Sequence, residues 1–275
     1  MINARLLIWC AAPIHEVRAV LHRYGMRSVL VEVESGTVVV PRDQMSLSVA
    51  TQWGYKVTRK THKAAVVFAW DDQAMLILPV AAVAFGWSWG DDKAAMNVMA
   101  QLADYGRARK ASMALLNAVL PSRQAPDKQA RAAKRIAEAM GVDEATVRPR
   151  VQQYEHRLPP EQLLDELGKG DVATVVRAVD AGHFDGWRAG RNKVIEWKRR
   201  YNSALLIAVA LGGIVGFTVA LMLPFLGVGP ILLGPAFGIL VLNIFWQWTR
   251  YRIRQLPIDE VLPIVQLPSD NQSAR

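Results

Sequence analysis

The stretch Tyr201–Thr249 reads YNSALLIAVALGGIVGFTVALMLPFLGVGPILLGPAFGILVLNIFWQWT and contains no Asp, Glu, Lys, Arg or His. Two apolar segments, Ser203–Leu223 and Ile231–Trp248, flank a break at Pro224–Pro230. As helices they would span about 31 Å and about 27 Å, which is close to the ~30 Å hydrocarbon core of a bilayer. The stretch therefore predicts a transmembrane helical hairpin over residues 201–249.

Basic residues flank this hairpin on both sides, and the connecting loop is uncharged. They include Lys198, Arg199 and Arg200 before the hairpin and Arg250, Arg252 and Arg254 after it. Basic residues next to transmembrane ends stay in the cytoplasm, so we expect a two-pass bacterial inner-membrane protein with both termini cytoplasmic. The same side chains are candidates for binding anionic lipid headgroups. Trp246 and Trp248 lie where an aromatic belt holds a helix end at the interface.

Small residues recur at every fourth position within the two apolar segments. They are Ala208, Gly212, Gly216 and Ala220 in the first segment and Gly234 and Gly238 in the second. Small residues at this spacing let helix backbones approach closely in a membrane. The spacing favours packing of the two helices of one hairpin, and association between copies into a homo-oligomer is the alternative.

The charge of the chain is concentrated beside the hairpin. The formal net charge is +9, of which residues 188–200 contribute +5 and residues 250–254 contribute +3. The rest of the chain is nearly neutral, which argues against a nucleic-acid partner. The single cysteine, Cys10, excludes an intramolecular disulfide and a zinc site made of several cysteines. No metal or cofactor motif is present, so neither is predicted.

Residues 1–90 predict a mixed α/β cytoplasmic domain. A buried strand is expected at Ala4–Cys10 and a helix at Ile14–Tyr24. Two strands, Val29–Val33 and Thr37–Val40, are expected to form a hairpin around the turn Glu34–Gly36. The next predicted elements are a short helix at Arg42–Trp53 and a β-hairpin formed by Lys56–Trp70 and Ala74–Phe85.

Residues 91–200 predict an all-helical cytoplasmic region. After Asp92–Leu120, the predicted helices are Lys128–Met140, Val147–His156, Glu161–Leu167 and Val172–Ala181. Residues 250–275 are expected to form an extended cytoplasmic tail, because Leu-Pro recurs at 256–257, 262–263 and 267–268 and proline is incompatible with a helix interior. The predicted fold class is thus an α+β cytoplasmic region with a two-helix transmembrane hairpin.

Gly86-Trp87-Ser88-Trp89-Gly90 matches G-x-S-x-G and suggests a catalytic candidate, Ser88. In this respect it resembles the nucleophile elbow of α/β-hydrolases, in which a turn after a strand exposes the serine and the next N–H helps to form the oxyanion hole. Those enzymes also require an acid and a histidine after the serine, and here only His156 and His183 follow. A tryptophan-rich structural turn is the alternative interpretation.

Residues 136–147 resemble a helix-turn-helix, with Ala137, Gly141 and Val147 at the spacing of two crossing helices. Pro149 would lie inside the second helix, where proline costs ~3 kcal/mol. A helical pair that does not bind DNA is therefore the favoured interpretation.

These features favour a non-enzymatic function at the inner membrane. The cytoplasmic region is expected to bind or regulate a membrane or cytoplasmic protein partner that belongs to a membrane-embedded machine for secretion, conjugation or entry exclusion. A membrane-bound serine hydrolase using Ser88 is one alternative, and an oligomerising membrane-disrupting effector is another. The apolar segments contain no ionisable residue that could relay a proton or an ion.

Overall fold

The computed structural model describes residues 5–41, 45, 47–70, 74–80, 83–89, 126–153, 159–185, 218, 240, 243–244, 246–248 and 250–267. The chain divides into two compact units. Unit 1 comprises Met1–Leu21, Arg27–Arg188 and Leu262–Arg275, and unit 2 comprises His22–Met26 and Ala189–Val261.

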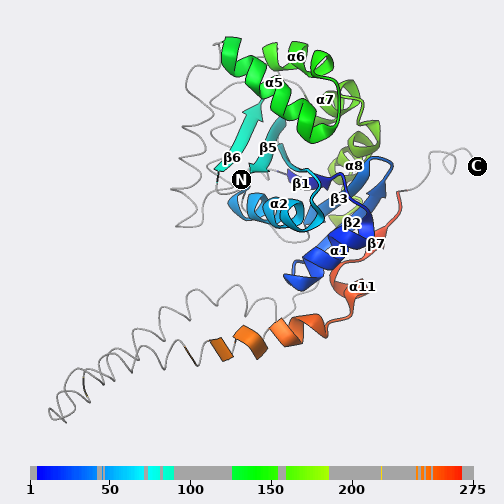
Figure 1. Cartoon of the computed structure of the whole chain (residues 1–275). Coiled ribbons are helices and arrows are strands. Elements are labelled where there is room, and N and C mark those ends of the chain that lie inside the picture. The colour runs from blue at the N-terminus through cyan, green and yellow to red at the C-terminus, as the bar shows by residue number, and fades with distance from the viewer. Residues whose placement is uncertain are drawn as a thin grey trace, which may run out of the picture. The chain divides into compact units, whose positions relative to one another are not determined.

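Unit 1 is built around a seven-stranded sheet with the strand order β6-β5-β4-β1-β3-β2-β7 (Figure 1). The strands are β1 (Arg5–Cys10), β2 (Ser28–Val33), β3 (Gly36–Pro41), β4 (Ala65–Trp70), β5 (Ala74–Val80), β6 (Val83–Ser88) and β7 (Ile264–Val265). All neighbouring pairs are antiparallel except β2 and β7, which run parallel. The first strand of the chain is therefore the central strand of the sheet.

Both faces of the sheet are covered by helices. All six residues of β4 are buried, whereas an antiparallel strand with one wet face would alternate between apolar and polar residues. Phe68 belongs to a core cluster that includes buried residues of the helical part of the chain between Ala132 and Phe184. On the opposite face, a Cβ added to Gly54 of α2 (Leu47–Thr61) would lie 3.2 Å from Val67 Cγ2. The long apolar runs in the sequence are explained by this double coverage.

The predicted β1, the helix α1 (Ile14–Arg23) and the β2–β3 hairpin are confirmed. The boundary predicted between helix and strand at residues 53–56 is wrong, because α2 continues to Thr61. The buried residues of α2 are Leu47, Ala50, Gly54, Val57 and Thr61. Their spacing of three and four residues is that of one helix face, so packing on the sheet favours a helix where the local alternation suggested a strand.

The predicted hairpin of β4 and β5 is confirmed by the pairs Phe68↔Leu76 and Trp70↔Ala74. The predicted single return strand Ala74–Phe85 is two strands, since β5 ends at Val80 and β6 begins at Val83. These strands pair with each other from Val80↔Val83 to Met75↔Ser88. A third strand thus extends the sheet where the sequence indicated one long strand.

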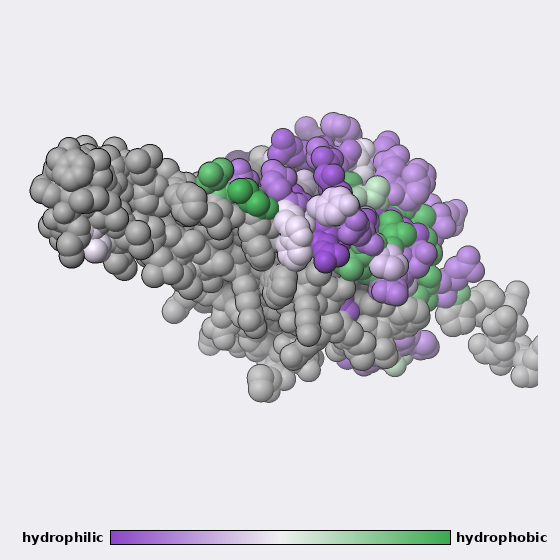
Figure 2. Space-filling view, turned by 90° about the horizontal axis from the view of Figure 1, so that it is seen from below, coloured by the Kyte–Doolittle hydropathy of each residue, from purple (hydrophilic) through white to green (hydrophobic). Residues whose placement is uncertain are grey.

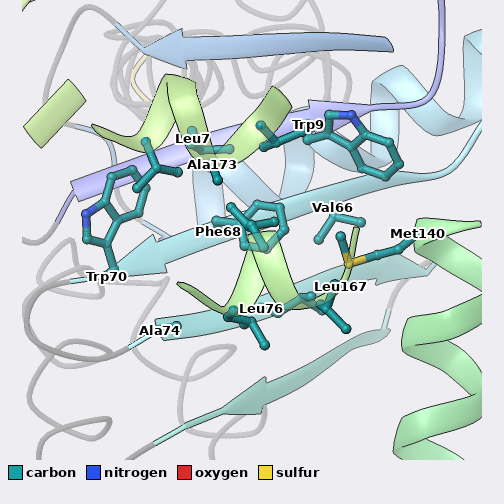
Figure 3. Packing of buried hydrophobic residues seen from close by; sticks show 14 of the residues in the cluster. Leu7, Trp9, Val66, Phe68, Trp70, Ala74, Leu76, Met140, Leu167 and Ala173 are labelled. Atoms are coloured by element: carbon teal, nitrogen blue, oxygen red, sulfur yellow. The ribbon is translucent and has the colours of Figure 1, made fainter. Parts of the chain in front are cut away.

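Helices α5 (Pro126–Met140), α6 (Glu144–Gln152), α7 (Pro160–Glu166) and α8 (Gly170–Asp180) confirm the predicted helical character of residues 126–153 and 159–185. Their buried side chains form one cluster with those of the sheet. Figure 3 shows this cluster, in which Leu7, Phe68 and Leu76 of the strands gather with Met140, Leu167 and Ala173 of the helical layer.

Polar contacts fix the helical layer on the sheet. Asp171 Oδ2 accepts a hydrogen bond of 2.7 Å from the backbone N–H of Ser35 in the β2–β3 turn. Trp9 Nε1 donates to Ser35 Oγ at 3.2 Å, and Lys169 Nζ lies 4.9 Å from the centroid of the Trp9 ring. Charge-assisted hydrogen bonds are stronger than neutral ones, so these contacts set the position of α8 relative to the hairpin.

The sequence predicts an extended tail over residues 250–275, and in the structure residues 250–267 are only partly extended. Arg250–Arg254 is helical, and a short helix, α11 (Ile258–Val261), lies between Pro257 and Pro263. Only Ile264–Val265 takes the predicted strand form, as β7. The four-residue helix fits between the two prolines because neither proline lies in its interior, where the ring would clash with the preceding turn.

The predicted transmembrane hairpin falls almost entirely outside the described residues. Of residues 201–249, Thr218, Leu240, Asn243, Ile244 and Trp246–Trp248 are described, and these are helical. Within the described part of the chain, no helix combines the length and the apolar character that crossing a membrane requires. On the face shown in Figure 2, hydrophilic residues cover most of the coloured surface and hydrophobic residues form small groups.

Candidate functional site

The end of the second apolar segment carries two arginine–tryptophan pairs, both in unit 2. Arg250 Cζ lies 4.9 Å from the centroid of the Trp246 ring, and Arg252 Cζ lies 5.4 Å from that of Trp248. Each pair joins residues i and i+4, which are neighbours on a helix surface. A guanidinium at this distance from an indole face is attracted by the ring quadrupole, with about 0.5–1 kcal/mol at an exposed site.

Large apolar side chains are exposed along the same part of the chain. Leu240 is 54% exposed, Ile244 62%, Trp248 40% and Tyr251 61%. Their spacing of four, four and three residues places them on one face of a helix. An exposed apolar stripe that ends in aromatic and arginine residues has the composition of a helix end at a membrane–water interface.

The residues after this stripe are fastened to the end of α1 within unit 2. Ile253 is 2% exposed and lies against Gly25, where an added Cβ would be 3.0 Å from both Ile253 Cδ1 and Cγ2. Gly25 has φ +59, and His22 Nε2 lies 3.2 Å from the carbonyl oxygen of Leu256. The close approach at Gly25 therefore fixes the register between residues 22–25 and residues 253–256 within unit 2.

Some of the candidate residues from the sequence can be located, and others cannot. Arg250, Arg252 and Arg254 are exposed. Lys198, Arg199 and Arg200 and the small residues Ala208, Gly212, Gly216, Ala220, Gly234 and Gly238 lie outside the described residues. The arginine–tryptophan pairing itself was missed at the sequence level, although the four-residue spacing of Trp246/Arg250 and Trp248/Arg252 is visible there.

Ser88, the catalytic candidate, is buried in a regular strand. It is 2% exposed and pairs with Met75 across the β5–β6 ladder. The N–H of Trp89, which an elbow would direct at an oxyanion, donates to Ala74 O at 2.9 Å. Of the two later histidines, His183 is exposed at the end of α8, with Nδ1 3.2 Å from Ala178 O, and His156 lies outside the described residues. This geometry provides neither an exposed nucleophile nor an oxyanion hole at Ser88.

Cys10 and Lys56 are the described titratable groups with a shifted pKa. Burial raises the pKa of the Cys10 thiol to about 11, against a lowering by its hydrogen bond with Thr61. A buried thiol that stays protonated at neutral pH is a poor nucleophile. Burial lowers the pKa of Lys56. Over the residues that the structure describes, no group of three His, Cys, Asp or Glu side chains could hold a metal ion.

Helices α5 and α6 form the helical pair that the sequence resembles. Asp143 caps α6 by accepting a hydrogen bond from Ala145 N at 3.1 Å, and Pro149 lies inside α6. Two arginines of α6 are paired with carboxylates: Arg148 with Glu144 at 3.1 Å and Arg150 with Glu166 at 2.9 Å. These are surface ion pairs of small energy, and the absence of a DNA partner stays a prediction from the sequence.

No family model matches this chain, and neither a curated protein nor a solved structure matches it.

Proposed function

We propose that this chain is a two-pass protein of the bacterial inner membrane, with residues 201–249 forming the hairpin and both termini in the cytoplasm. In this proposal unit 1, which we call the sheet domain, binds or regulates a protein partner that belongs to a membrane-embedded machine. The observation that carries the membrane location is the stacking of Arg250 on Trp246 and of Arg252 on Trp248 at the end of the apolar face.

Physical arguments favour lipid as the environment of this helix face. An exposed stripe of Leu240, Ile244, Trp248 and Tyr251 is unfavourable in water, because roughly 25 cal/mol is lost for each Å² of apolar surface left exposed. In a bilayer the apolar side chains enter the hydrocarbon, the indoles take the interface, and the guanidinium groups reach the headgroups. The uncharged stretch of residues 201–249 supplies the length for two crossings.

A binding role is supported by the construction of the sheet domain. Trp9, Phe68 and Trp70 fill one side of the sheet with packed side chains, and α2 covers the other side. Ser88, the candidate nucleophile, is enclosed in this packing.

Cysteine labelling in intact cells tests the topology. In a Cys10→Ala background, Val228→Cys reports on the loop and Ser273→Cys on the C-terminal end. A membrane-impermeant maleimide should label the loop cysteine in intact cells and the C-terminal cysteine only after the inner membrane is permeabilised. Labelling of Ser273→Cys in intact cells would remove one crossing and overturn the proposed architecture.

Photo-crosslinking in intact membranes tests the partner. Photoreactive residues at two exposed positions of unit 1, Ile264 and Val49, sample different elements, β7 and α2. A component of a membrane machine recovered reproducibly from one position and not from the other supports the proposal and locates the interface. Recovery of the same abundant proteins from both positions, with no machine component, would contradict it.

A further inference from the structure

Residues 262–267, which we call the strap, add the last strand to the sheet of unit 1 although they are far away in sequence. Ile264 lies opposite Leu30 and Val265 opposite Val31, in parallel orientation. The backbone N–H of Leu30 donates to Pro263 O at 2.9 Å. Arg18 Nε of α1 donates to Leu262 O at 3.0 Å. The strap is thus held by the edge of β2 and by one side chain of α1.

The first two residues of the strap, Leu262 and Pro263, are buried, and exposed and partly buried side chains alternate after them. Leu262 is fully buried, and Val265 and Leu267 pack against the core cluster from partly buried positions. Ile264 is 43% exposed, and Gln266 is exposed as well. Leu262 is therefore the largest buried apolar side chain of the strap, beside the buried Pro263, whereas Ile264 contributes less burial.

The backbone pairing of the strap is short. β2 has six residues, of which Leu30 and Val31 pair with the strap, whereas all six pair with β3. Pro263, the second residue of the strap, and Pro268, which follows it in the sequence, have no N–H to donate to a ladder. A backbone hydrogen bond has a net stabilising effect of about 0.5–1.5 kcal/mol. Release of the strap therefore costs much less than separation of β2 from β3.

We propose that the strap is an internal ligand, and that the outer edge of β2 together with Arg18 is a docking site for an extended apolar peptide of a partner protein. The strap fills this site in the free protein and is displaced when the partner strand adds to the sheet. The partner strand runs parallel to β2, offers a carbonyl to Arg18, and carries a leucine-sized side chain at the position of Leu262. Such strand addition takes its affinity from main-chain hydrogen bonds and its specificity from alternate side chains.

Two features of the chain favour displacement over a permanent seventh strand. The strap belongs to the same chain, so it returns to the edge of β2 whenever no partner is bound and limits unspecific pairing, which is the hazard of an exposed edge strand. Pro263 and Pro268 limit the pairing of the strap with β2 to a few residues, so a partner strand has few main-chain hydrogen bonds to replace. The docking edge belongs to the folded sheet and does not require that residues 201–249 cross a membrane.

The test uses the full-length chain in detergent and a fluorescent peptide with the sequence of Pro257–Leu267. Leu262→Asp removes the anchor and opens the strap, and Ile264→Asp is the matched control in the same strand at an exposed position. Occupancy of a site lowers the apparent affinity in proportion to the fraction that is free. With a strap that is closed nine-tenths of the time, the Leu262→Asp chain should bind the peptide about tenfold more tightly than the wild type.

Hydrogen exchange gives a second, independent readout. The amide of Leu30 faces the strap, whereas that of Val31 faces β3, because successive residues of a strand direct their backbone groups to opposite sides. Leu262→Asp should remove the protection of the Leu30 amide and keep that of Val31, which also reports that the sheet is folded. The milder Leu262→Ala serves if the aspartate variant does not fold.

Several results would overturn the proposal. One is equal peptide affinity of the wild type and the folded Leu262 variant, and another is no binding to either. A third is a Leu30 amide that stays protected in both Leu262 variants. A control peptide with aspartate in place of Leu262 should not bind, and equal binding of this peptide would show that the edge of β2 does not select the anchor.

Discussion

The indole Nε1 of Trp70, at the end of β4, donates a hydrogen bond of 3.0 Å to Oδ1 of Asp180, at the end of α8. The same carboxylate oxygen pairs with the guanidinium of Arg5 at the start of β1. The ring of Trp70 is buried, whereas Asp180 and Arg5 are partly exposed. One carboxylate of α8 therefore joins this helix to two adjacent strands, β1 and β4.

Replacement of Asp180 should destabilise unit 1. Asp180→Ala leaves the buried Trp70 N–H without an acceptor, which costs about 1–3 kcal/mol. Asp180→Asn keeps an oxygen acceptor and loses only the charge, so we expect less than about 1 kcal/mol, as for a partly exposed ion pair. Urea unfolding of both variants measures the difference. Equal losses would show that the charge, and not the indole hydrogen bond, is the main contribution.

Gly25→Ala should disturb unit 2 more than Gly141→Ala disturbs unit 1. Both glycines have a positive φ, +59 and +64, so the backbone strain of roughly 1 kcal/mol is similar. A Cβ at Gly25 also meets Ile253 at 3.0 Å, whereas nothing lies within 4 Å of one at Gly141. Proteolysis near Arg254 should therefore accelerate in the Gly25 variant only. Equal susceptibility of the two variants would show that the Gly25–Ile253 contact does not hold this segment.

Cys10 should make the protein less stable at alkaline pH. Its pKa is about 11 in the folded chain and 9.0 as the ordinary value, so the unfolded thiol ionises first. The stability is complete below pH 9 and falls as the pH rises toward 11, by roughly 3 kcal/mol at most. The unfolding free energies of the wild type and of Cys10→Ala are measured across this pH range, and their difference isolates the contribution of Cys10. Lys56 has the opposite effect, because its lowered pKa favours the folded state as the pH rises, but it is present in both proteins and its contribution cancels in the difference. A difference that does not change with pH would contradict the burial of the thiol.

Ser88→Ala should preserve biological activity, and a serine-directed active-site probe should not label the wild type. Ser88 Oγ is buried and has no hydrogen-bond partner within the part of the chain that the structure describes. Its removal should leave the unfolding free energy unchanged or raise it by up to about 1 kcal/mol. Ser28→Ala is the matched control, because Ser28 Oγ, on β2, is also buried and also has no hydrogen-bond partner among the described residues. Labelling that Ser88→Ala abolishes would instead support the serine-hydrolase alternative.

Substitution of the small residues in the apolar segments distinguishes packing within one hairpin from association between copies. Gly212→Ile and Gly216→Ile force helix backbones apart. If the spacing serves one hairpin, these changes should lower the membrane yield and leave the crosslinked oligomeric state unchanged. Loss of an oligomer while the monomer stays inserted would indicate association between copies. Depolarisation of cells that make the wild type, and not of those that make the variants, would favour the membrane-disrupting alternative.

The local elements could be predicted where their signal lies in adjacent residues. The apolar run of β1, the two-residue turn between Val33 and Gly36, and the helical spacing of α5 to α8 depend on contacts a few residues apart. The predicted helix Arg42–Trp53 has the wrong end, because the alternating pattern of Lys56–Trp70 was interpreted as a strand. The buried residues of α2 follow the i, i+3, i+7 spacing of a helix face up to Thr61. A count of both periods over Leu47–Thr61 could have found the longer helix.

The candidate site residues also fall into those whose setting the sequence shows and those whose setting only the structure shows. The position of Arg250, Arg252 and Arg254 beside an apolar segment is visible in the sequence alone, and their role as a headgroup-binding site stays a prediction. The burial of Ser88 could not be predicted, since the five-residue match says nothing about the strand on which the serine packs. The contact between Gly25 and Ile253 could not be predicted either, because it joins residues more than 200 positions apart.

The sequence by itself determined the order and type of most elements, the uncharged stretch of residues 201–249, and the basic residues that flank it. These properties follow from periodicity and composition, which act over one or two turns of chain. The tertiary structure alone decided that β1 lies at the centre of the sheet, that Trp70 and Arg5 meet at Asp180, and that the strap runs beside β2. Such pairings depend on which distant surfaces exclude water together, and no local pattern specifies that choice.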